Sequence, residues 1–407
     1  MTQPLLQAAD LRGAARLTTD AVTGLASLVE AMHARIAGLP GASGLGQAVP
    51  DNERTRGITG LVYKSVRGVT HLVGGTSEAL LGLLEPLLAP SEPNQPPRPE
   101  REAVLAALNG VLGDHLAASD NPLAITMRFR RSGQPLPLER MSLRSSLRGA
   151  APRLLVLLHG LCMNDLQWRH AGHDHGEALE RELGYTPVYL HYNSGLSVST
   201  NGRILAELME RLYDAWPAPI ESFAMVGHSM GGLVARSAIH HGALMPRGGL
   251  RWSARVKNLV CLGTPHQGAP LERAGHGVDL LLGAAPFAAP LARLSRVRSA
   301  GINDLRLGNV VSPPAGDDGT HRCTQVSLPN GTRCYAVAGR LGPSTGSLKA
   351  KLLGDGLVPV GSALGRHHDA DRRLAFPSDH QAVVHDTSHL GLLSSPEVYG
   401  RLRRWLM

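Results

Sequence analysis

The feature that most constrains this sequence is a serine between two glycines, at a point where an apolar run passes into a helical pattern. The run 223–226 precedes Gly227-His228-Ser229-Met230-Gly231, and apolar residues recur at helical spacing afterwards. A serine at the apex of a strand-to-helix turn adopts a strained backbone, and the flanking glycines leave room for it. The sequence therefore predicts a nucleophile elbow, with the Ser229 hydroxyl exposed above a sheet.

A nucleophilic serine needs a base, and the base needs an acid that orients it. In chains built around such an elbow, the acid and then the histidine follow the serine. Asp355 lies between two glycines just before an apolar stretch, and His389 precedes a helix that Ser395 caps and Pro396 opens. We therefore expect Ser229, Asp355 and His389 to be the catalytic residues.

Other residues compete for two of these roles. Asp355 could instead accept hydrogen bonds from the amides of its own turn, in which case Asp279 or Asp304 would supply the acid. His385 is the strongest alternative base. The remaining alternatives lie in a polar, loop-like stretch and are His367, His368 and His380.

The charge that develops on an attacked carbonyl needs backbone donors, one of them from the loop after an earlier strand. The apolar run 153–158 predicts a strand buried on both faces, and it leads into His159-Gly160-Leu161-Cys162. A sharp turn at Gly160 would direct the Leu161 N–H toward the serine. The expected oxyanion donors are thus the main-chain amides of Leu161 and Met230. The glycines expected to shape the elbow and this loop are Gly160, Gly227 and Gly231.

Together these motifs resemble those of bacterial serine esterases and lipases of the α/β-hydrolase superfamily. More narrowly, they are similar to the GPI-inositol-deacylase-like (lipase-like) branch. The matching segments are 159–165, 227–232, Leu262-Gly263-Thr264-Pro265-His266-Gln267-Gly268, 355–359 and His389-Leu390. The resemblance covers about residues 150–407. It implies a Ser229–His389–Asp355 triad that hydrolyses esters without a metal or organic cofactor, but it does not imply action on GPI anchors.

The order of elements predicts an α/β-hydrolase fold, in which helices cover both faces of a mostly parallel central sheet. Alternating apolar residues at 125–129 and a turn at 132–133 predict an antiparallel edge hairpin. Later strands are expected at 186–190 and 334–338, and a helix at 204–213. A final helix should follow Ser395.

We expect two parts in the 407-residue chain. Residues 1–120 form a helical extension with a proline-rich linker near 89–100, and residues 121–407 form the catalytic domain. An apolar insertion near 266–312 fits a lid or an acyl-binding wall, or alternatively a helix buried against the core. The extension, including a helix at 101–118, either packs on the hydrolase, which we favour, or docks on a lipid surface.

The apolar insertion favours fatty-acyl esters as substrates over small polar esters. An acyltransferase or thioesterase would use the same three residues with a different acceptor or substrate. A third hypothesis is a non-catalytic protein that binds lipid surfaces through its N-terminal helices. Intact serine, acid and histidine in the expected order argue against that third hypothesis.

Composition limits the partners. The net charge of +8 comes mostly from dispersed arginine, and no Lys/Arg-rich block with interleaved aromatic residues suggests nucleic-acid binding. The N-terminus lacks a signal-peptide pattern, and no window of about 20 clean apolar residues predicts a membrane span. We therefore expect a cytoplasmic protein, with peripheral membrane contact as the alternative.

Cysteines and histidines outside these motifs suggest no cofactor. Cys323 and Cys334 flank the turn 329–331 and could pair across a hairpin, whereas Cys261 fits a buried strand. The cluster His170, His173 and His175 lacks the pattern of a metal site, and we expect solvent-facing histidines there. No metal is expected.

Overall fold

The computed structural model describes residues 99–245, 250–269, 299–312, 326–342 and 354–407. Several expectations fall outside the described residues: the helical extension N-terminal to residue 99, most of the linker, Asp279, Cys323 and residues 270–298 of the expected lid. The chain divides into two compact units. Residues 94–120 and 124–407 form one of them, and this unit carries the sheet.

An eight-stranded sheet forms the centre of this unit, counted over the described residues. Its order is β2-β1-β4-β3-β5-β6-β7-β8. Strands β1 (Arg128–Arg131) and β2 (Gln134–Pro135) form the antiparallel edge hairpin expected from the sequence, and β1 also pairs antiparallel with β4. The other strands pair in parallel and are β3 (Arg153–Leu158), β4 (Tyr185–His191), β5 (Ser222–His228), β6 (Asn258–Leu262), β7 (Arg333–Arg340) and β8 (Gln381–His385).

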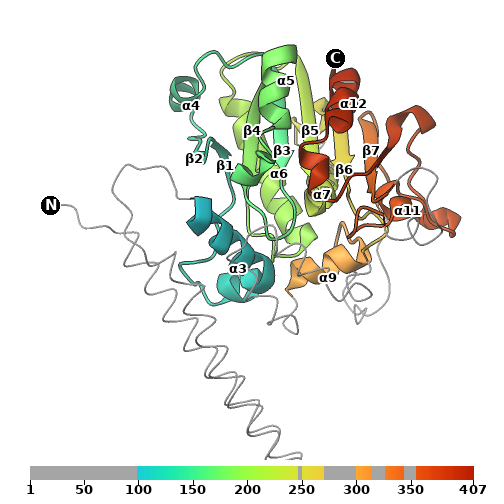
Figure 1. The fold of residues 1–407 in the computed structure, drawn as a ribbon. Helices are drawn as coiled ribbons and strands as arrows, with labels where there is room; N and C mark the ends of the chain where they lie inside the picture. The colour runs from blue at the N-terminus through green and yellow to red at the C-terminus, as the bar shows by residue number, and fades with distance from the viewer. Residues whose placement is uncertain (1–98, 246–249, 270–298, 313–325, 343–353) are drawn as a thin grey trace, which may run out of the picture. The chain divides into compact units, whose positions relative to one another are not determined.

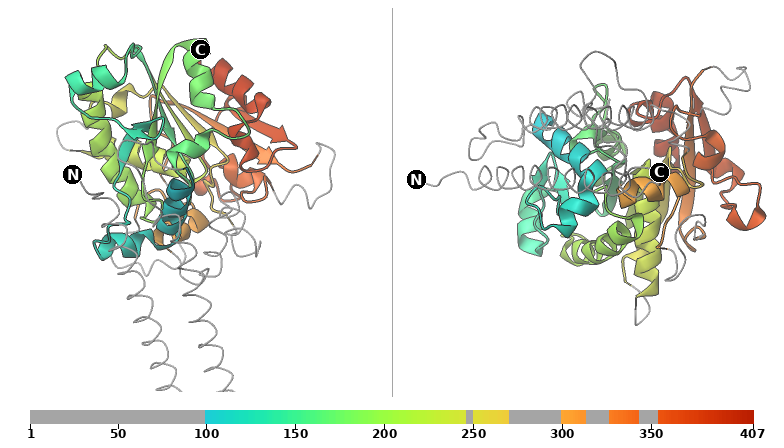
Figure 2. Two further views of the ribbon diagram at one scale, coloured as in Figure 1. Left: turned by 60° about the vertical axis from the view of Figure 1, so that its left-hand side comes forward. Right: turned by 90° about the horizontal axis from the view of Figure 1, so that it is seen from below.

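Helices cover both faces of the sheet (Figures 1 and 2). Helices α5 (His175–Leu183) and α12 (Pro396–Leu406) lie on one face, and α6 (Val198–Ala215) and α7 (Met230–Leu244) pack together on the other. Ser395 caps α12 as expected, since its hydroxyl accepts from the Val398 N–H at 3.4 Å and a proline opens the helix. The mostly parallel, doubly covered sheet confirms the predicted α/β-hydrolase fold.

The remaining short elements connect or flank these layers. They are α4 (Arg140–Ser146), η2 (Asp165–Trp168), η3 (Ser253–Arg255), α9 (Ala300–Leu307), α11 (Val360–Ala363), η5 (Ala370–Arg372), η6 (Ser378–His380) and η7 (Gly391–Leu393). Among the described residues, no helix is both long and apolar enough to span a bilayer.

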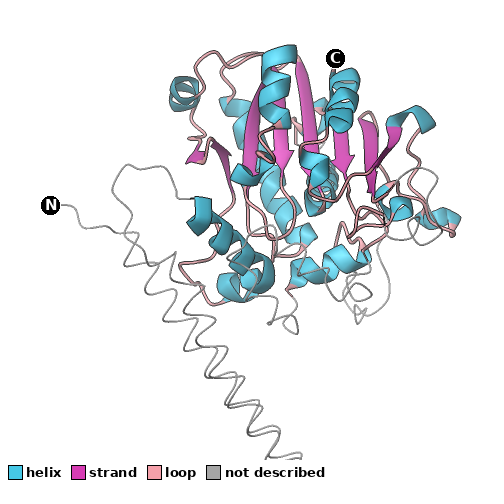
Figure 3. Cartoon of the chain, viewed as in Figure 1, coloured by secondary structure: helices cyan, strands magenta, loops and turns pink. Residues whose placement is uncertain are grey.

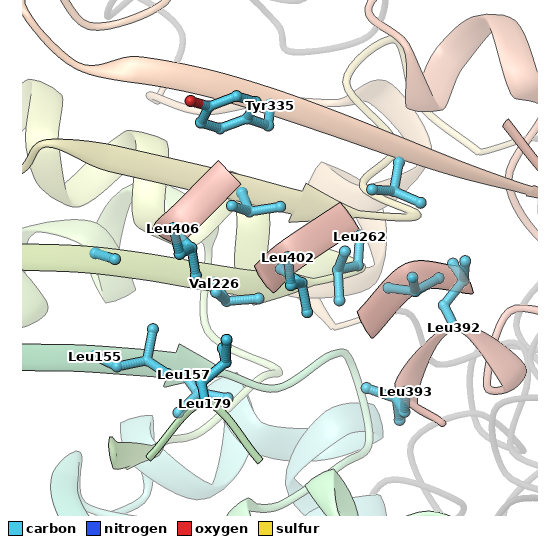
Figure 4. Close-up of a cluster of buried hydrophobic side chains, with 14 of the residues drawn as sticks. Leu155, Leu157, Leu179, Val226, Leu262, Tyr335, Leu392, Leu393, Leu402 and Leu406 are labelled. Atoms are coloured by element: carbon cyan, nitrogen blue, oxygen red, sulfur yellow. The ribbon is translucent and has the colours of Figure 1, made fainter. Parts of the chain in front are cut away.

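The core between the sheet and the α5/α12 layer is mostly aliphatic, with aromatic side chains such as Trp168, Tyr335 and Trp405 among them. Leu155 and Leu157 of β3 meet Leu179 of α5, while Leu402 and Leu406 of α12 pack over neighbouring strands (Figure 4). These side chains belong to one buried cluster. Burying apolar surface stabilises a fold by about 25 cal/mol per Å², so such a layer is the main stabilising contribution.

Helix α3 (Pro99–Ala118) belongs to the same compact unit as the sheet. The sequence placed this helix in the extension that ends at residue 120, but the structure divides the chain N-terminal to it, near residue 94. Val104, Ala107 and Leu108 are fully buried. The strand arrows point toward the end of the sheet at which α3 and α9 lie (Figures 1 and 3). The carboxyl ends of the parallel strands thus face these two helices.

Candidate active site

The predicted elbow is present between β5 and α7. Ser229 has φ 53° and ψ −123°, a backbone conformation that non-glycine residues rarely adopt. A Cβ on Gly227 would lie 2.4 Å from the Gly232 nitrogen, and one on Gly231 would lie 2.2 Å from the Leu158 oxygen. The Ser229 N–H donates to the Leu262 carbonyl at 2.8 Å. The two glycines therefore permit a close approach that holds the serine at the end of the central strands.

Asp355 and His389 form a buried pair. The Nδ1 of His389 lies 2.7 Å from the Asp355 Oδ2, and the His389 N–H donates to the Asp355 carbonyl at 3.0 Å. The second carboxylate oxygen accepts from the Leu357 and Val358 amides at 3.0 and 2.8 Å. With Nδ1–H directed at the carboxylate, Nε2 is left as the acceptor. That atom is buried and has no hydrogen-bond partner among the described residues.

Two further contacts bring His389 to the elbow. The His228 Nε2 lies 3.0 Å from the His389 carbonyl, which accepts its hydrogen bond, and the two rings are 4.7 Å apart. Gly263 follows Leu262, whose carbonyl accepts from the Ser229 amide. A Cβ on Gly263 would lie 3.1 Å from both the Asp355 Oδ2 and the His389 Cε1. All three expected catalytic residues thus lie at the carboxyl edge of the sheet, after β5, β7 and β8.

The alternative acids and bases lie in different settings. Asp304 accepts from the Val198 amide and from Asn309, which is a structural role at the start of α6. His385 is half-buried at the end of β8, and His380 bonds the Cys334 carbonyl. The rings of His367 and His368 lie 4.1 Å apart. Among the histidines considered, only His389 has a carboxylate within hydrogen-bond distance in the described part of the chain.

The loop after β3 passes beside the serine, as expected. A Cβ on Gly160 would lie 3.1 Å from the Ser229 Cβ. Leu161 follows Gly160, and Met230 begins α7, so its amide has no partner within the helix. Both residues are fully buried. The loop that carries Leu161 therefore lies against the elbow that carries Met230.

Two further histidines flank the serine and are held neutral by burial. Burial lowers the pKa of His159 to about 3 and lowers the pKa of His228 well below its ordinary value. His159 stacks on Tyr192, whose hydroxyl donates to the His159 carbonyl at 2.8 Å. Because the His159 and His228 rings are neutral, neither adds a positive charge near the Asp355–His389 pair.

The cysteines do not compete as nucleophiles. Burial raises the pKa values of Cys162, Cys261 and Cys334 to about 12, so their thiols stay protonated. Cys334 is a free thiol, and Cys323 lies outside the described residues. The pairing considered from the sequence therefore stays a prediction.

The histidine cluster after η2 has a packing role. The His173 Nε2 and the His175 Nδ1 are 2.9 Å apart, and the His175 Nε2 bonds the Leu392 carbonyl at 2.9 Å. The expectation of solvent-facing histidines is wrong for His175, which is fully buried. Tyr399 of α12 stacks on its ring, and this packing encloses it.

A buried charged cluster was not anticipated from the sequence. Glu102, Asp165 and His191 place donor atoms within 4.8 Å of one another, the spacing of a metal site. The guanidinium of Arg130, however, already contacts both carboxylates, at 2.5 and 3.2 Å. The group is therefore an ionic network. The sequence contained one indication that Glu102 lies on a packed helical face, because it shares that face with Ala106 and Asn109.

Comparison with known proteins supports this architecture. Residues 151–313 match the family model of the PGAP1-like alpha/beta domain. No curated protein has a matching sequence.

Several solved structures are similar in fold. The mature lipase BlEst2 of Bacillus licheniformis is 19% identical over 69% of this chain and 98% of its own, with a TM-score of 0.43. A gene product of Listeria innocua is 16% identical over 62% and 93%, with a TM-score of 0.36. An esterase of Pyrococcus furiosus is 15% identical over 64% and 84%, with a TM-score of 0.36. By sequence, residues 151–313 match the PGAP1-like alpha/beta domain, and they belong to the unit whose sheet has the α/β-hydrolase fold.

Proposed function

We propose that this protein is a serine hydrolase of carboxylic esters. The observation that carries the proposal is the buried Asp355–His389 pair, whose Nε2 has no partner among the described residues and whose main-chain carbonyl accepts from His228, the residue before the strained elbow serine. A carboxylate, an imidazole and a serine in this relation are the elements of nucleophilic acyl transfer. The match of residues 151–313 to the PGAP1-like domain agrees with it.

The proposed reaction has two halves. The Nε2 of His389 takes the Ser229 proton as the hydroxyl oxygen attacks the ester carbonyl, and Asp355 stabilises the imidazolium that forms. The amides of Leu161 and Met230 donate to the oxyanion of the tetrahedral intermediate. His389 then gives its proton to the departing alcohol. Water attacks the acyl-enzyme in the second half and restores Ser229, so no metal or cofactor enters a step.

Active-site labelling tests the assignment of residues. We expect a fluorophosphonate probe to label the intact protein and the His385→Ala variant, but neither Ser229→Ala nor His389→Ala. His385→Ala is the matched control, because this histidine lies at the end of the neighbouring strand without a carboxylate partner among the described residues. Labelling that survives in Ser229→Ala would refute the assignment of the nucleophile, and labelling lost only in His385→Ala would move the base there.

The substrate class is the second part of the proposal. The apolar composition of the insertion near 266–312 supports fatty-acyl esters. A series of p-nitrophenyl esters from acetyl to palmitoyl should give kcat/KM that rises with chain length. A maximum at acetyl would contradict the fatty-acyl proposal while leaving ester hydrolysis intact. Faster product release with an added alcohol or thiol, which forms a new ester or thioester, would instead identify an acyltransferase.

A further inference from the structure

Helix α3 lies directly on the loop that carries the proposed oxyanion donor Leu161. Gly110 of α3 faces Cys162, the residue after that donor. A Cβ on Gly110 would lie 2.3 Å from the Cys162 Sγ and 2.9 Å from its Cα. A glycine inside a helix is less stable than an alanine, so the absence of a side chain here serves the contact between the helix and the loop.

Cys162 has an unusual backbone that its surroundings maintain. Its φ is +60°, in the left-handed region that non-glycine residues seldom occupy. Its N–H donates to the Ser194 hydroxyl at 3.0 Å. Both Cys162 and Ser194 are buried, so this hydrogen bond does not compete with water. The conformation at Cys162 determines how the chain turns immediately after Leu161.

The loop that carries Ser194 is itself attached to α3. The Asn193 side chain donates to the Gly113 carbonyl at 2.8 Å, and a Cβ on Gly195 would lie 2.1 Å from the Asn109 carbonyl oxygen. Helix α3 therefore contacts the oxyanion loop at Cys162 and also positions the hydroxyl that holds the Cys162 amide.

An ionic network holds the same loop at Asp165. Glu102 of α3 contacts Arg130, which contacts Asp165, and the Asp165 Oδ1 lies 3.2 Å from the His191 Nδ1. Asp165 comes three residues after Cys162, and the side chains of all four network residues are 8% exposed or less. The N-terminal part of α3 is thus attached to the far end of the oxyanion loop.

We propose that helix α3 is a positioning element of the active site. It holds Cys162 in its left-handed conformation through Gly110 and Ser194, and so fixes the direction of the Leu161 N–H. The proposal rests on the proposed function, in which that amide stabilises the tetrahedral intermediate. Gly110 and Ser194 are accordingly positioning residues, since neither contacts the reacting atoms.

The first test is Gly110→Ala, with Gly400→Ala in α12 as the matched control. Both glycines lie inside helices, but a Cβ on Gly400 would have no atom within 4 Å. Because the oxyanion donors act in the transition state, we expect Gly110→Ala to lower kcat by roughly 10- to 100-fold with little change in KM. Gly400→Ala should leave both constants unchanged.

Rescue distinguishes positioning from general loosening of the fold. Cys162→Gly removes the Sγ that a new Cβ at residue 110 would strike, and glycine tolerates the positive φ. The double variant Gly110→Ala with Cys162→Gly should recover part of the kcat that Gly110→Ala loses, because the Sγ contact is removed while the 2.9 Å approach to the Cα of residue 162 remains. A double variant no more active than Gly110→Ala would count against the proposed contact.

Ser194→Ala is the second variant, and it tests the same contact independently if Gly110→Ala fails to fold. It removes one hydroxyl and should lower kcat about tenfold at unchanged KM, with Ser253→Ala, a hydroxyl that bonds the Leu250 carbonyl, as control. Unchanged kcat in both Gly110→Ala and Ser194→Ala, with an active parent, would overturn the role of α3 alone. An intact protein without turnover that depends on Ser229 would overturn the proposed function and this inference together.

Discussion

At the scale of single residues, the site depends on backbone conformations that cost free energy. Ser229 and Cys162 both have positive φ without being glycine, at about 1–3 kcal/mol each. Such strain persists because the surroundings impose it: the elbow amide bonds the Leu262 carbonyl, and the Cys162 amide bonds Ser194. Each strained residue is next in the chain to one of the proposed oxyanion donors, Leu161 and Met230.

Asp355→Asn tests the orienting role of the carboxylate. The single amide oxygen should stay with the Leu357 and Val358 amides, which leaves the NH2 group to donate to Nδ1. His389 should then adopt the tautomer that cannot take the serine proton. We expect kcat to fall about 10⁴-fold, measured with a soluble ester. Asp304→Asn is the control, because Asp304 accepts only from groups on α6 and the loop after α9 in the described structure. A loss below about tenfold in Asp355→Asn would contradict the role.

At the scale of elements, α3 is the least expected contributor. It carries Glu102 into a network with Arg130, Asp165 and His191, and it also contacts α9, since the Ser299 hydroxyl donates to the Gly110 carbonyl at 2.7 Å. A helix that lies N-terminal to the first strand of the sheet is therefore part of the folded unit. Helix α3 should unfold together with the sheet.

Arg130→Met tests the ionic network. Removing the guanidinium leaves the buried carboxylates of Glu102 and Asp165 without their shared cation, and an unpaired buried charge is costly. We expect the free energy of unfolding to fall by about 3–5 kcal/mol, measured by urea denaturation. Arg181→Met, at an arginine whose side chain is 71% exposed, should change it by less than about 0.5 kcal/mol. Equal effects of the two substitutions would show that the network does not stabilise the fold.

At the scale of the whole molecule, several imidazoles are buried in neutral form. Burial lowers the pKa of His159 to about 3 and that of His175 to about 4, from 6.5. Because these pKa values are lower in the folded state, the unfolded chain takes up protons first as the pH falls. The stability these groups contribute is therefore complete above pH 6.5 and decreases progressively below it.

Acid should destabilise the protein well before its carboxylates titrate. Each of these two histidines should remove about 2 kcal/mol from the free energy of unfolding between pH 6.5 and pH 5. Urea denaturation at a series of pH values measures the slope. His175→Gln should make the slope shallower, whereas His368→Gln, at an exposed position, serves as control. A slope that stays the same in His175→Gln would refute the assignment to this histidine.

The sequence by itself determined the elements and their chemistry. A strand, a glycine-flanked serine and a helix are adjacent in the chain, so their conformations are set by local sterics and by apolar periodicity. The same holds for the strands at 153–158 and 186–190 and for the cap at Ser395. The order of serine, acid and histidine was also readable, although their catalytic roles remain a proposal.

Only the tertiary structure decided which distant residues meet. The sequence left His385 and Asp304 as alternatives, whereas the structure pairs Asp355 with His389, because the segments after the neighbouring strands β7 and β8 meet. It also placed α3 on the loop that carries Leu161, through a charge and a glycine whose partners lie 28 residues (Glu102 to Arg130) and 52 residues (Gly110 to Cys162) away. Local patterns specify which face of an element is buried, whereas its partner depends on the packing of the whole chain.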